Sequence, residues 1–214
     1  MEDSYLTLDG PCIGEFKDRA SKFLAYSWPV QSEQEIQEHL DALRKEHFKA
    51  RHHCYAWRLG REGLLFRAND DGEPSGTAGR PILGQIDSSG LTDVLIVVVR
   101  YFGGTLLGTS GLINAYREAA AEALRAGTVK TVVLHDRFHL HTDYGIMPDV
   151  VQAVHKLQLT IEEETFTDRA HLIIAIRRRD VSQKLLELKA RIWKTSTDEA
   201  ATLDWPPGME IEKM

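Results

Sequence analysis

The chain has 214 residues, of which 43% are hydrophobic and 27% charged, and its net charge at pH 7 is −6. This composition is typical of a globular protein with one large domain or two small ones, and it argues against a general nucleic-acid coat, which would usually be basic. No apolar run approaches the roughly 20 residues of a membrane helix, and the acidic N-terminus lacks the pattern of a secretory signal. Two distant cysteines form no disulfide framework. We expect a cytoplasmic protein without a cofactor.

The N-terminal part of the chain predicts a strand followed by a helix. Residues 1–13 carry little pattern and are expected to form an arm or an edge, whereas residues 14–28 have strand composition and Pro29 ends them. Ser32 and Glu35 then form a capping box, which predicts a helix start. Four side chains recur at helical spacing and predict its packed face: Ile36, Leu40, Leu43 and His47.

A β-hairpin is predicted next, from residues 52–59 and 64–67 around a glycine-containing turn. Alternation along its first strand places His53 on one face and His52 and Cys54 on the other. These three residues therefore cannot readily share one metal ion. His53 could line a cleft, and Cys54 is expected to be a small core residue.

Residues 69–79 form a long loop rich in glycine and acidic side chains, ahead of a short helix. Its carboxylates could bind a divalent cation, act as acid and base, or cap the loop's own backbone. Alternatively, Asp71 or Glu73 could pair with Arg80 or Arg100 and fix the loops. We favour a structural role for the carboxylates. The weak catalytic candidates are Asp71, Glu73 and His53.

The centre of the chain predicts a strand, a glycine-spaced loop and a helix. Residues 94–99 are apolar and predict a strand that is buried on both faces. Residues 103–111 form the loop, and a helix follows from about Leu112 to Ala126, with unpaired first-turn amides at the positive end of its dipole. This geometry can bind an anion, although the glycines could serve a tight crossover alone. The candidate ligand- or anion-binding residues are Arg100, Tyr101, Phe102, Gly103, Gly104, Gly108, Thr109, Ser110 and Gly111, with Arg80, Lys17 and Arg19 as neighbouring cations.

After residue 133 the order of predicted elements is β-α-β-β-α with a possible last strand near residues 197–205, which is the ferredoxin-like plan. We therefore expect two domains, residues 1–133 and 134–214. Basic residues 177–179 are expected to be a solvated edge, because the strands offer no aromatic pair for RNA. The large aromatic side chains of this part are expected in its core: Phe166, Trp193 and Trp205.

The strand that opens the second domain carries alternating histidines. His135, His139, His141 and Asp143 share one of its faces, and residues two apart are close enough to share a metal ion. A solvated sheet face is the commoner explanation of such a pattern. We therefore predict no metal site.

Two stretches, NDDGEPSGTAGRPIL and DVLIVVVRYFGGTLLGTSGLINAYREAA, resemble the Impact/YigZ family, the imprinted ancient protein family, in its bacterial two-domain form. The resemblance covers residues 14–133. It implies an α+β fold, with an N-terminal domain similar to domain 2 of ribosomal protein S5 and a small ferredoxin-like C-terminal domain. The positions that match the family motif are Gly79, Ile82, Leu83, Ile86, Leu91, Val97, Val98, Arg100, Tyr101, Phe102, Gly103, Gly104 and Gly108.

Eukaryotic members of this family regulate translation by competing for the activator of a kinase that responds to amino-acid starvation. They do so with the help of an additional N-terminal RWD domain, for which the residues before Gly14 leave no room. The resemblance therefore implies a link to translation, but the role in the kinase pathway is not carried over.

Two functions follow. The first is a cytoplasmic binding or regulatory protein linked to translation, with RNA, the ribosome or a translation factor bound through the glycine-rich anion-binding cleft. The alternative is an enzyme that acts on a small phosphorylated or nucleotide ligand in the same cleft. Polynucleotide binding should weaken steeply with salt, and binding of a single phosphate should not. Removing Arg100 is expected to weaken binding with little loss of fold.

Overall fold

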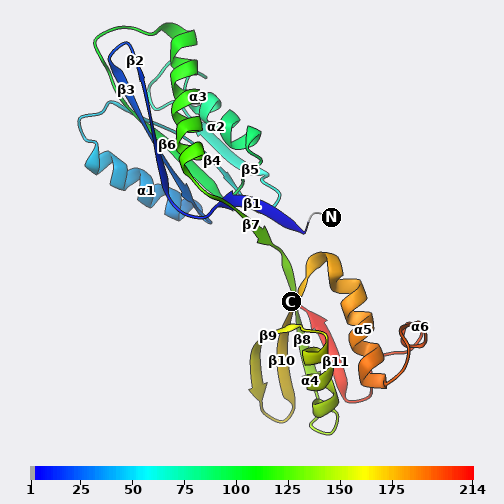
Figure 1. Cartoon of the computed structure of the whole chain (residues 1–214). Coiled ribbons are helices and arrows are strands. Elements are labelled where there is room, and N and C mark those ends of the chain that lie inside the picture. The colour runs from blue at the N-terminus through cyan, green and yellow to red at the C-terminus, as the bar shows by residue number, and fades with distance from the viewer. Residues whose placement is uncertain (1–2) are drawn as a thin grey trace. The chain divides into compact units, whose positions relative to one another are not determined.

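The structure, a computed structural model, describes residues 3–214 and divides them into two compact units. The first unit comprises Ser4–Val132, and the second comprises Asp3 with Val133–Met214 (Figure 1). Each unit contains its own antiparallel sheet and helices, so the predicted α+β class is confirmed. None of the described helices is both long and apolar enough to cross a membrane.

The first unit is built on a five-stranded sheet in the order β2-β3-β6-β4-β5. Its central strand β6 is the predicted apolar run, and every residue from Val94 to Arg100 is buried because helices cover both faces of the sheet. The strands are β2 (Cys12–Asp18), β3 (Ser21–Pro29), β4 (His52–Leu59), β5 (Leu65–Asn69) and β6 (Val94–Tyr101).

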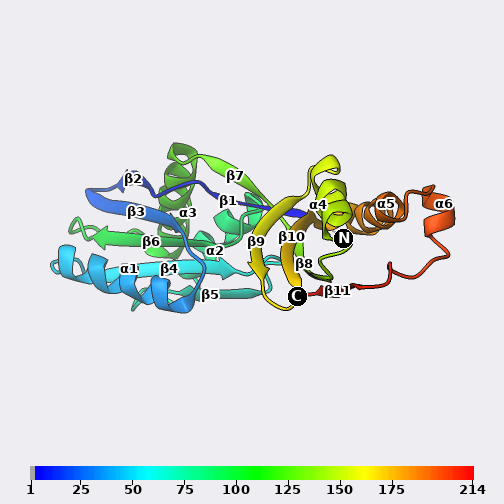
Figure 2. The same ribbon diagram turned by 90° about the horizontal axis from the view of Figure 1, so that it is seen from below.

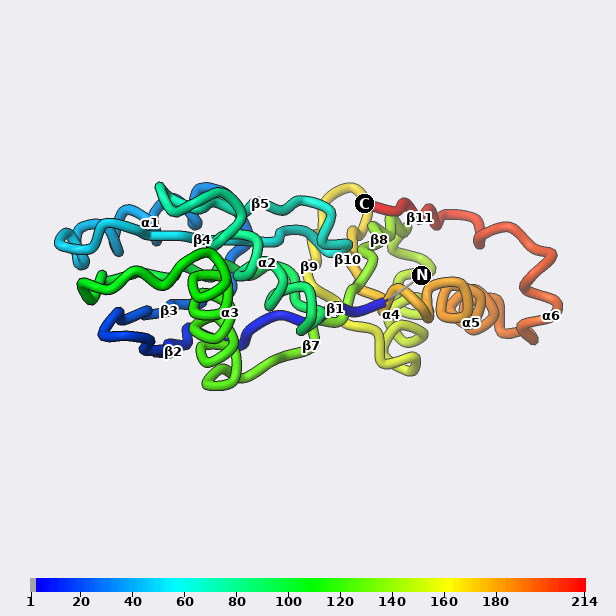
Figure 3. The backbone as a smooth tube through the Cα atoms, turned by 90° about the horizontal axis from the view of Figure 1, so that it is seen from above, coloured from blue at the N-terminus to red at the C-terminus, as the bar shows by residue number. Residues whose placement is uncertain are grey.

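Three helices form the outer layers of this unit. Helix α1 (Glu33–Glu46) covers one face, which is turned to the viewer in Figure 2, and it begins at the predicted Ser32 cap. Helices α2 (Gly79–Ser88) and α3 (Gly108–Ala126) cover the opposite face, which Figure 3 shows. Strands β1 (Ser4–Leu8) and β7 (Val129–Val133) pair in a separate two-stranded sheet.

Two local predictions for this unit were wrong. Residues 14–28 are not one strand, because Arg19 and Ala20 adopt left-handed backbone angles (φ 44° and 63°) and close a tight turn between β2 and β3. Part of the N-terminal segment, expected to be an arm or an edge, forms the edge strand β1, while residues 1 and 2 lie outside the described part. Helix α3 begins at Gly108, four residues before the predicted start, so the glycine loop is shorter.

The second unit is a four-stranded antiparallel sheet in the order β11-β8-β10-β9, with α4 and α5 packed on one face. The other face of the sheet carries the alternating histidines of β8. In chain order the elements are β8 (His135–Thr142), α4 (Met147–Lys156), β9 (Thr160–Phe166), β10 (Ala170–Arg177), the 3-10 turn Arg178–Asp180, α5 (Val181–Trp193), α6 (Thr197–Ala200) and β11 (Met209–Lys213).

Two predictions for the second unit need correction. The last strand is β11, and part of the segment predicted as a strand is the short helix α6, which the Ser196 hydroxyl caps. Phe166 and Trp193 do not lie in the core, since they are 52% and 38% exposed. Trp205 packs against the core from a partly buried position, so the core prediction was correct for that residue alone.

Candidate functional site

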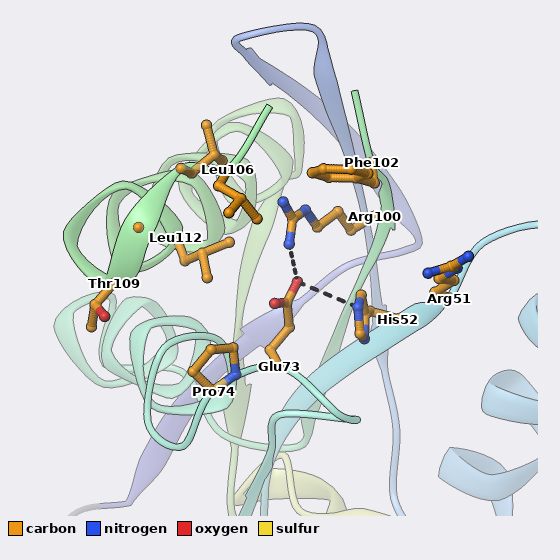
Figure 4. Close-up of a pocket in the computed structure, with 11 residues that line it drawn as sticks. Arg51, His52, Glu73, Pro74, Arg100, Phe102, Leu106, Thr109 and Leu112 are labelled. Atoms are coloured by element: carbon orange, nitrogen blue, oxygen red, sulfur yellow. Dashed lines mark hydrogen bonds and ion pairs between the residues drawn. The ribbon is translucent and has the colours of Figure 1, made fainter. Parts of the chain in front are cut away.

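A pocket of about 430 Å³ opens in the first unit where the end of β6 meets the start of α3. Its wall combines apolar side chains with two arginines, as Figure 4 shows. Because α3 begins at this wall, its unpaired first-turn amides lie at the pocket. The lining residues are Arg51 and His52 at the start of β4, Glu73 and Pro74 from the acidic loop, Arg100 and Phe102 from the end of β6, and Leu106, Leu107, Gly108, Thr109 and Leu112 at the start of α3.

A buried ion pair forms one side of this pocket. The Arg100 Nη1 atom lies 2.6 Å from Glu73 Oε1, and the two side chains are only 7% and 4% exposed. The Tyr116 hydroxyl, from α3, donates to the same carboxylate oxygen at 2.7 Å. Thus the loop, the central strand and the helix are joined through one oxygen atom. Removing one partner of a buried pair leaves an uncompensated charge, so we now expect removal of Arg100 to reduce stability, in contrast to the sequence-based expectation.

Aromatic rings hold the arginine from two sides. The guanidinium carbon of Arg100 lies 5.5 Å from the ring centroids of both Phe23 and Phe102. Phe23 is buried, whereas Phe102 is 51% exposed and presents part of its ring to the pocket. The Nε atom of Arg100 has no hydrogen-bond partner among the described residues. The arginine is therefore held in place, and its buried Nε–H donor is left without a partner among these residues.

The acidic loop uses two further carboxylates to hold its own backbone. Asp70 accepts hydrogen bonds from the backbone N–H groups of Gly76, Ala78 and Gly79 at 2.8 to 2.9 Å. Burial alone would raise the pKa of Asp70, but these three bonds outweigh it and the pKa is lowered. Asp71 accepts from the backbone N–H of His53 at 2.7 Å. Both carboxylates therefore support the loop.

His52 connects this loop to the pocket. Its Nδ1 atom lies 2.8 Å from the carbonyl oxygen of Asp71, and a carbonyl can only accept, so Nδ1 carries a proton. Its Nε2 atom faces Glu73 Oε1 at 3.9 Å. One nitrogen of the ring is therefore fixed by the loop, and the other is turned toward the pocket carboxylate.

Cys54 lies beneath the same network and is fully buried. Its thiol donates to the Asp70 carbonyl at 3.0 Å and contacts the Tyr116 hydroxyl at 3.3 Å. Burial raises the pKa of both the Cys54 thiol and the Tyr116 hydroxyl. Since the thiolate is the nucleophilic form, Cys54 is a core residue here.

A protein of Haemophilus influenzae, described as an IMPACT family member, is 34% identical over 186 residues, which cover 86% of this chain and 90% of the relative. The chain belongs to the IMPACT family. The profile of the Impact N-terminal domain matches residues 19–124, a range that includes the whole pocket. The Bacillus subtilis IMPACT family member YvyE is 35% identical and covers 78% of this chain and 77% of its own.

One solved structure supports the fold assignment of this IMPACT family chain. A crystal structure of a hypothetical protein shares 29% identity, covers 92% of this chain and 96% of its own, and gives a TM-score of 0.68. The structure of Yih1, described as a two-domain translational regulator, also has 29% identity, but it covers 59% of this chain and 48% of its own with a TM-score of 0.35.

The pocket brings together only part of the predicted anion-binding set. Arg100, Phe102, Gly108 and Thr109 line it. Tyr101 does not, because successive strand residues point to opposite faces: its hydroxyl lies 2.8 Å from His47 Nδ1 on the α1 side of the sheet.

The predicted glycines separate into different roles. Gly103 approaches the β2–β3 turn so closely that a Cβ atom would lie 2.1 Å from the carbonyl carbon of Ala20. Its N–H donates to the Ser21 hydroxyl and is not available to a ligand. Gly104 lies in the open part of the loop with φ 86°. Ser110 and Gly111 lie in the first turn of α3 and do not line the pocket.

The three predicted neighbouring cations also lie outside the pocket lining. Lys17 pairs with Glu15 at 2.8 Å on the edge strand β2. The guanidinium of Arg19 donates to the Leu106 carbonyl at 3.4 Å and thereby contacts the glycine-rich loop. Arg80 is exposed on α2, where its charge helps to lower the pKa of Asp70.

Of the weak catalytic candidates, Glu73 alone lines the pocket. His53 points to the α1 side and is 5% exposed, and its Nε2 atom finds no partner within residues 3–214. Burial lowers the pKa of His53, which favours the neutral ring. The ring is therefore separated from the pocket by the sheet.

Sequence reasoning missed Arg51 and His52, as well as the apolar wall. The signal for His52 was strand register, since β4 pairs antiparallel with β6 and His52 lies opposite Arg100. That register requires knowledge of which strands are neighbours, and the chain order alone does not supply it. The missed apolar wall residues are Pro74, Leu106, Leu107 and Leu112.

Proposed function

We propose that this IMPACT family protein is a cytoplasmic binding protein linked to translation, and that its pocket takes one nucleotide of single-stranded RNA. The observation that carries the proposal is the half-exposed Phe102 ring beside basic side chains and the N-terminus of α3. Single-stranded RNA is bound where bases stack on aromatic rings and phosphates meet positive groups. The pocket supplies both.

The phosphate would lie between Arg51 and the first turn of α3. Arg51 lines the pocket with an exposed side chain. The amides of Gly108 and Thr109 lie in the first turn of α3, where unpaired N–H groups and the helix dipole favour negative charge. The α3 N-cap residue, Leu107, has no side chain that could satisfy those amides. These groups would supply local positive charge on a chain whose net charge is −6.

The base would stack on Phe102, with apolar contacts from Leu106. Leu106 is 81% exposed, so both side chains present apolar surface to water at the pocket mouth. Covering this surface with a flat base would release that water. Stacking of a base on an aromatic ring contributes about 1–3 kcal/mol.

The link to translation rests on family membership, because eukaryotic members regulate translation. RNA is the partner that the pocket chemistry favours over the ribosome as a whole or a translation factor. The choice of RNA also fits the acidic loop, because its carboxylates are hydrogen-bonded within the protein.

The alternative function is an enzyme that acts on a small phosphorylated or nucleotide ligand in the same pocket. Such an enzyme needs a free acid, base or metal ligand. Asp70 and Asp71 accept backbone N–H groups, and Glu73 accepts from Arg100 and Tyr116. These engagements favour binding over catalysis.

Binding to a labelled RNA of about 12 nucleotides, followed by fluorescence anisotropy, tests the proposal. Phe102→Ala should weaken binding about 5- to 150-fold, which corresponds to the loss of one stacked base. Arg51→Ala should weaken it less and should flatten the plot of log affinity against log salt concentration, because one phosphate contact is removed.

Two matched substitutions in the second unit serve as controls. Phe166→Ala removes a ring that is 52% exposed, and Arg137→Ala removes an arginine whose side chain is 62% exposed. Neither should change RNA affinity. The proposal is wrong if the parent protein does not bind RNA at physiological salt, or if Phe166→Ala weakens binding as much as Phe102→Ala. Saturation by one mononucleotide per chain, with little salt dependence, would support the enzyme alternative.

A further inference from the structure

Three histidines converge on the open face of the four-stranded sheet in the second unit. Along β8 the side chains alternate, so that Phe138, Leu140 and Thr142 are buried under α4 and α5, while His139 and His141 point to the other face. The neighbouring strand β10 adds His171, which is paired in register with His141. Sequence reasoning found the two histidines of β8 but not the third, because strand order brings β10 beside β8.

The three rings are close enough to share one ion. One ring nitrogen from each of His139, His141 and His171 lies within 4.8 Å of the others. The Nδ1 atoms of His141 and His171 are 3.0 Å apart, and the rings of His139 and His141 have centroids 3.9 Å apart. Zinc–nitrogen bonds of about 2.0–2.1 Å place tetrahedral ligand atoms about 3.3 Å apart. Side-chain rotations that close distances of up to 4.8 Å would bring the three nitrogens to that spacing.

The outer contact of one histidine in the cluster matches the pattern of a metal site. In metal-bound histidine the second ring nitrogen usually bonds to an oxygen, which fixes the ring. The Nε2 atom of His171 lies 3.1 Å from the Thr167 hydroxyl, so its Nδ1 atom is directed into the cluster. Glu163 lines the same cavity as His139 and His171, where its carboxylate adds negative charge beside a bound cation.

A cavity of about 270 Å³ beside His139 and His171 gives an ion access from solvent.

We propose that His139, His141 and His171 bind one zinc ion, with the fourth coordination position open toward the cavity beside Glu163. Three nitrogen ligands on a rigid sheet suit Zn²⁺, whose sites with three protein ligands keep one position for water or substrate. From the sequence alone we favoured a solvated face for the β8 histidines; in the structure, His171 from a second strand joins His139 and His141. His135 takes no part, because the three ligands lie farther along the strands.

The test uses tag-free full-length protein that has been stripped with EDTA and dialysed. Calorimetric titration with zinc chloride should show one ion per chain. Titration with Co²⁺ should give the visible absorption bands of a tetrahedral site, and Zn²⁺ should abolish them. His141→Ala and His171→Ala should each lower zinc affinity at least tenfold, since each removes one ligand.

The matched control is His135→Ala, on the same strand and the same face but outside the cluster. It should bind zinc as the parent does. The proposal is overturned if the parent takes up no zinc, if its cobalt complex lacks tetrahedral bands, or if His135→Ala and His141→Ala bind zinc equally. The cobalt spectrum of the parent decides the matter even if a variant fails to fold, and an unchanged spectrum in His139→Gln would also refute the assignment.

Discussion

At the residue scale, the acidic loop shows how carboxylates can serve a fold instead of a reaction. The sequence offered four roles for them, and the structure shows the capping and pairing roles. Asp70 accepts three backbone N–H groups, and Glu73 pairs with Arg100 across the pocket. A loop rich in glycine stays ordered because these carboxylates satisfy donors that would otherwise require water.

Asp70→Asn tests this role. An amide keeps one acceptor oxygen but directs an NH₂ group at a backbone donor, so we expect the variant to lose about 1–2 kcal/mol of unfolding free energy at pH 7. The pKa of Asp70 in the folded protein lies below its ordinary value of 3.8. Its contribution is therefore complete above that value and is lost as the pH falls toward the lower folded pKa.

Urea denaturation of both proteins at several pH values measures this effect. The difference between them should be largest near neutrality and should shrink below about pH 4. The control is Asn69→Asp at the end of β5, which adds a charge beside the loop, keeps an acceptor for the Asp71 N–H and leaves the three N–H groups of Gly76, Ala78 and Gly79 untouched. A pH-independent difference between parent and Asp70→Asn would contradict the assignment.

At the element scale, the close contact between α3 and β2 organises the first unit. A Cβ atom on Gly14 would lie 2.2 Å from the backbone nitrogen of Ala123, which is far inside any allowed contact. The small side chains of Ala119, Ala120 and Ala123 allow the helix to approach in this way. Helix α3 also brings Tyr116 and its own N-terminus to the pocket. The close packing of α3 on β2 therefore helps to position the site.

Gly14→Ala should therefore destabilise the first unit by at least about 1–3 kcal/mol, because the backbone must move to admit one methyl group. Gly10→Ala is the control, since a Cβ atom there would meet nothing within 4 Å. Thermal unfolding followed by circular dichroism measures both variants. Equal melting temperatures for the two would show that α3 can move away from β2 at little cost.

Local signals predicted most elements correctly. The Ser32 cap, the apolar run of β6 and the packed stripe of α3 (Leu112, Tyr116, Ala119 and Ala123) all depend on near neighbours in sequence. The turn between β2 and β3 was missed because Arg19 and Ala20 adopt left-handed angles that usually mark glycine or asparagine. Similarly, β11 is a short strand whose pairing with β8 is set by tertiary contacts.

Only those parts of the candidate site that depend on neighbouring residues in the sequence could be predicted. Arg100 and Phe102 stand in a recognisable strand-to-loop sequence, and both line the pocket. The ion pair was one of several open alternatives, and which acidic residue meets Arg100 depends on how the loop folds. The histidine cluster needs strand order as well, because His171 follows His141 by 30 residues.

At the scale of the whole molecule, each of the three apolar clusters draws its residues from one unit alone. We therefore predict that the two units unfold separately. Leu172→Ala, at a fully buried position of β10, should lower the stability of the second unit by about 2–5 kcal/mol and leave β6 unaffected.

Hydrogen exchange followed by mass spectrometry resolves the two units in the intact chain. Amides of β8 and β10 should exchange faster in Leu172→Ala, and those of β6 should exchange at the parent rate. Ile96→Ala, at a fully buried position of β6, is the reciprocal variant and should produce the opposite pattern. Equal loss of protection in both units for either variant would show that they unfold together.

The Glu73–Arg100 pair should make the pocket sensitive to the number of negative charges on a bound phosphate group. Because Glu73 already neutralises Arg100, an incoming anion meets Arg51 and the helix amides while a fixed negative charge stands beside them. A phosphodiester carries one negative charge and is tolerated there, whereas a terminal phosphomonoester carries close to two and is repelled more strongly by the carboxylate. The pocket should therefore prefer the interior of a polynucleotide strand to its phosphorylated ends and to free mononucleotides.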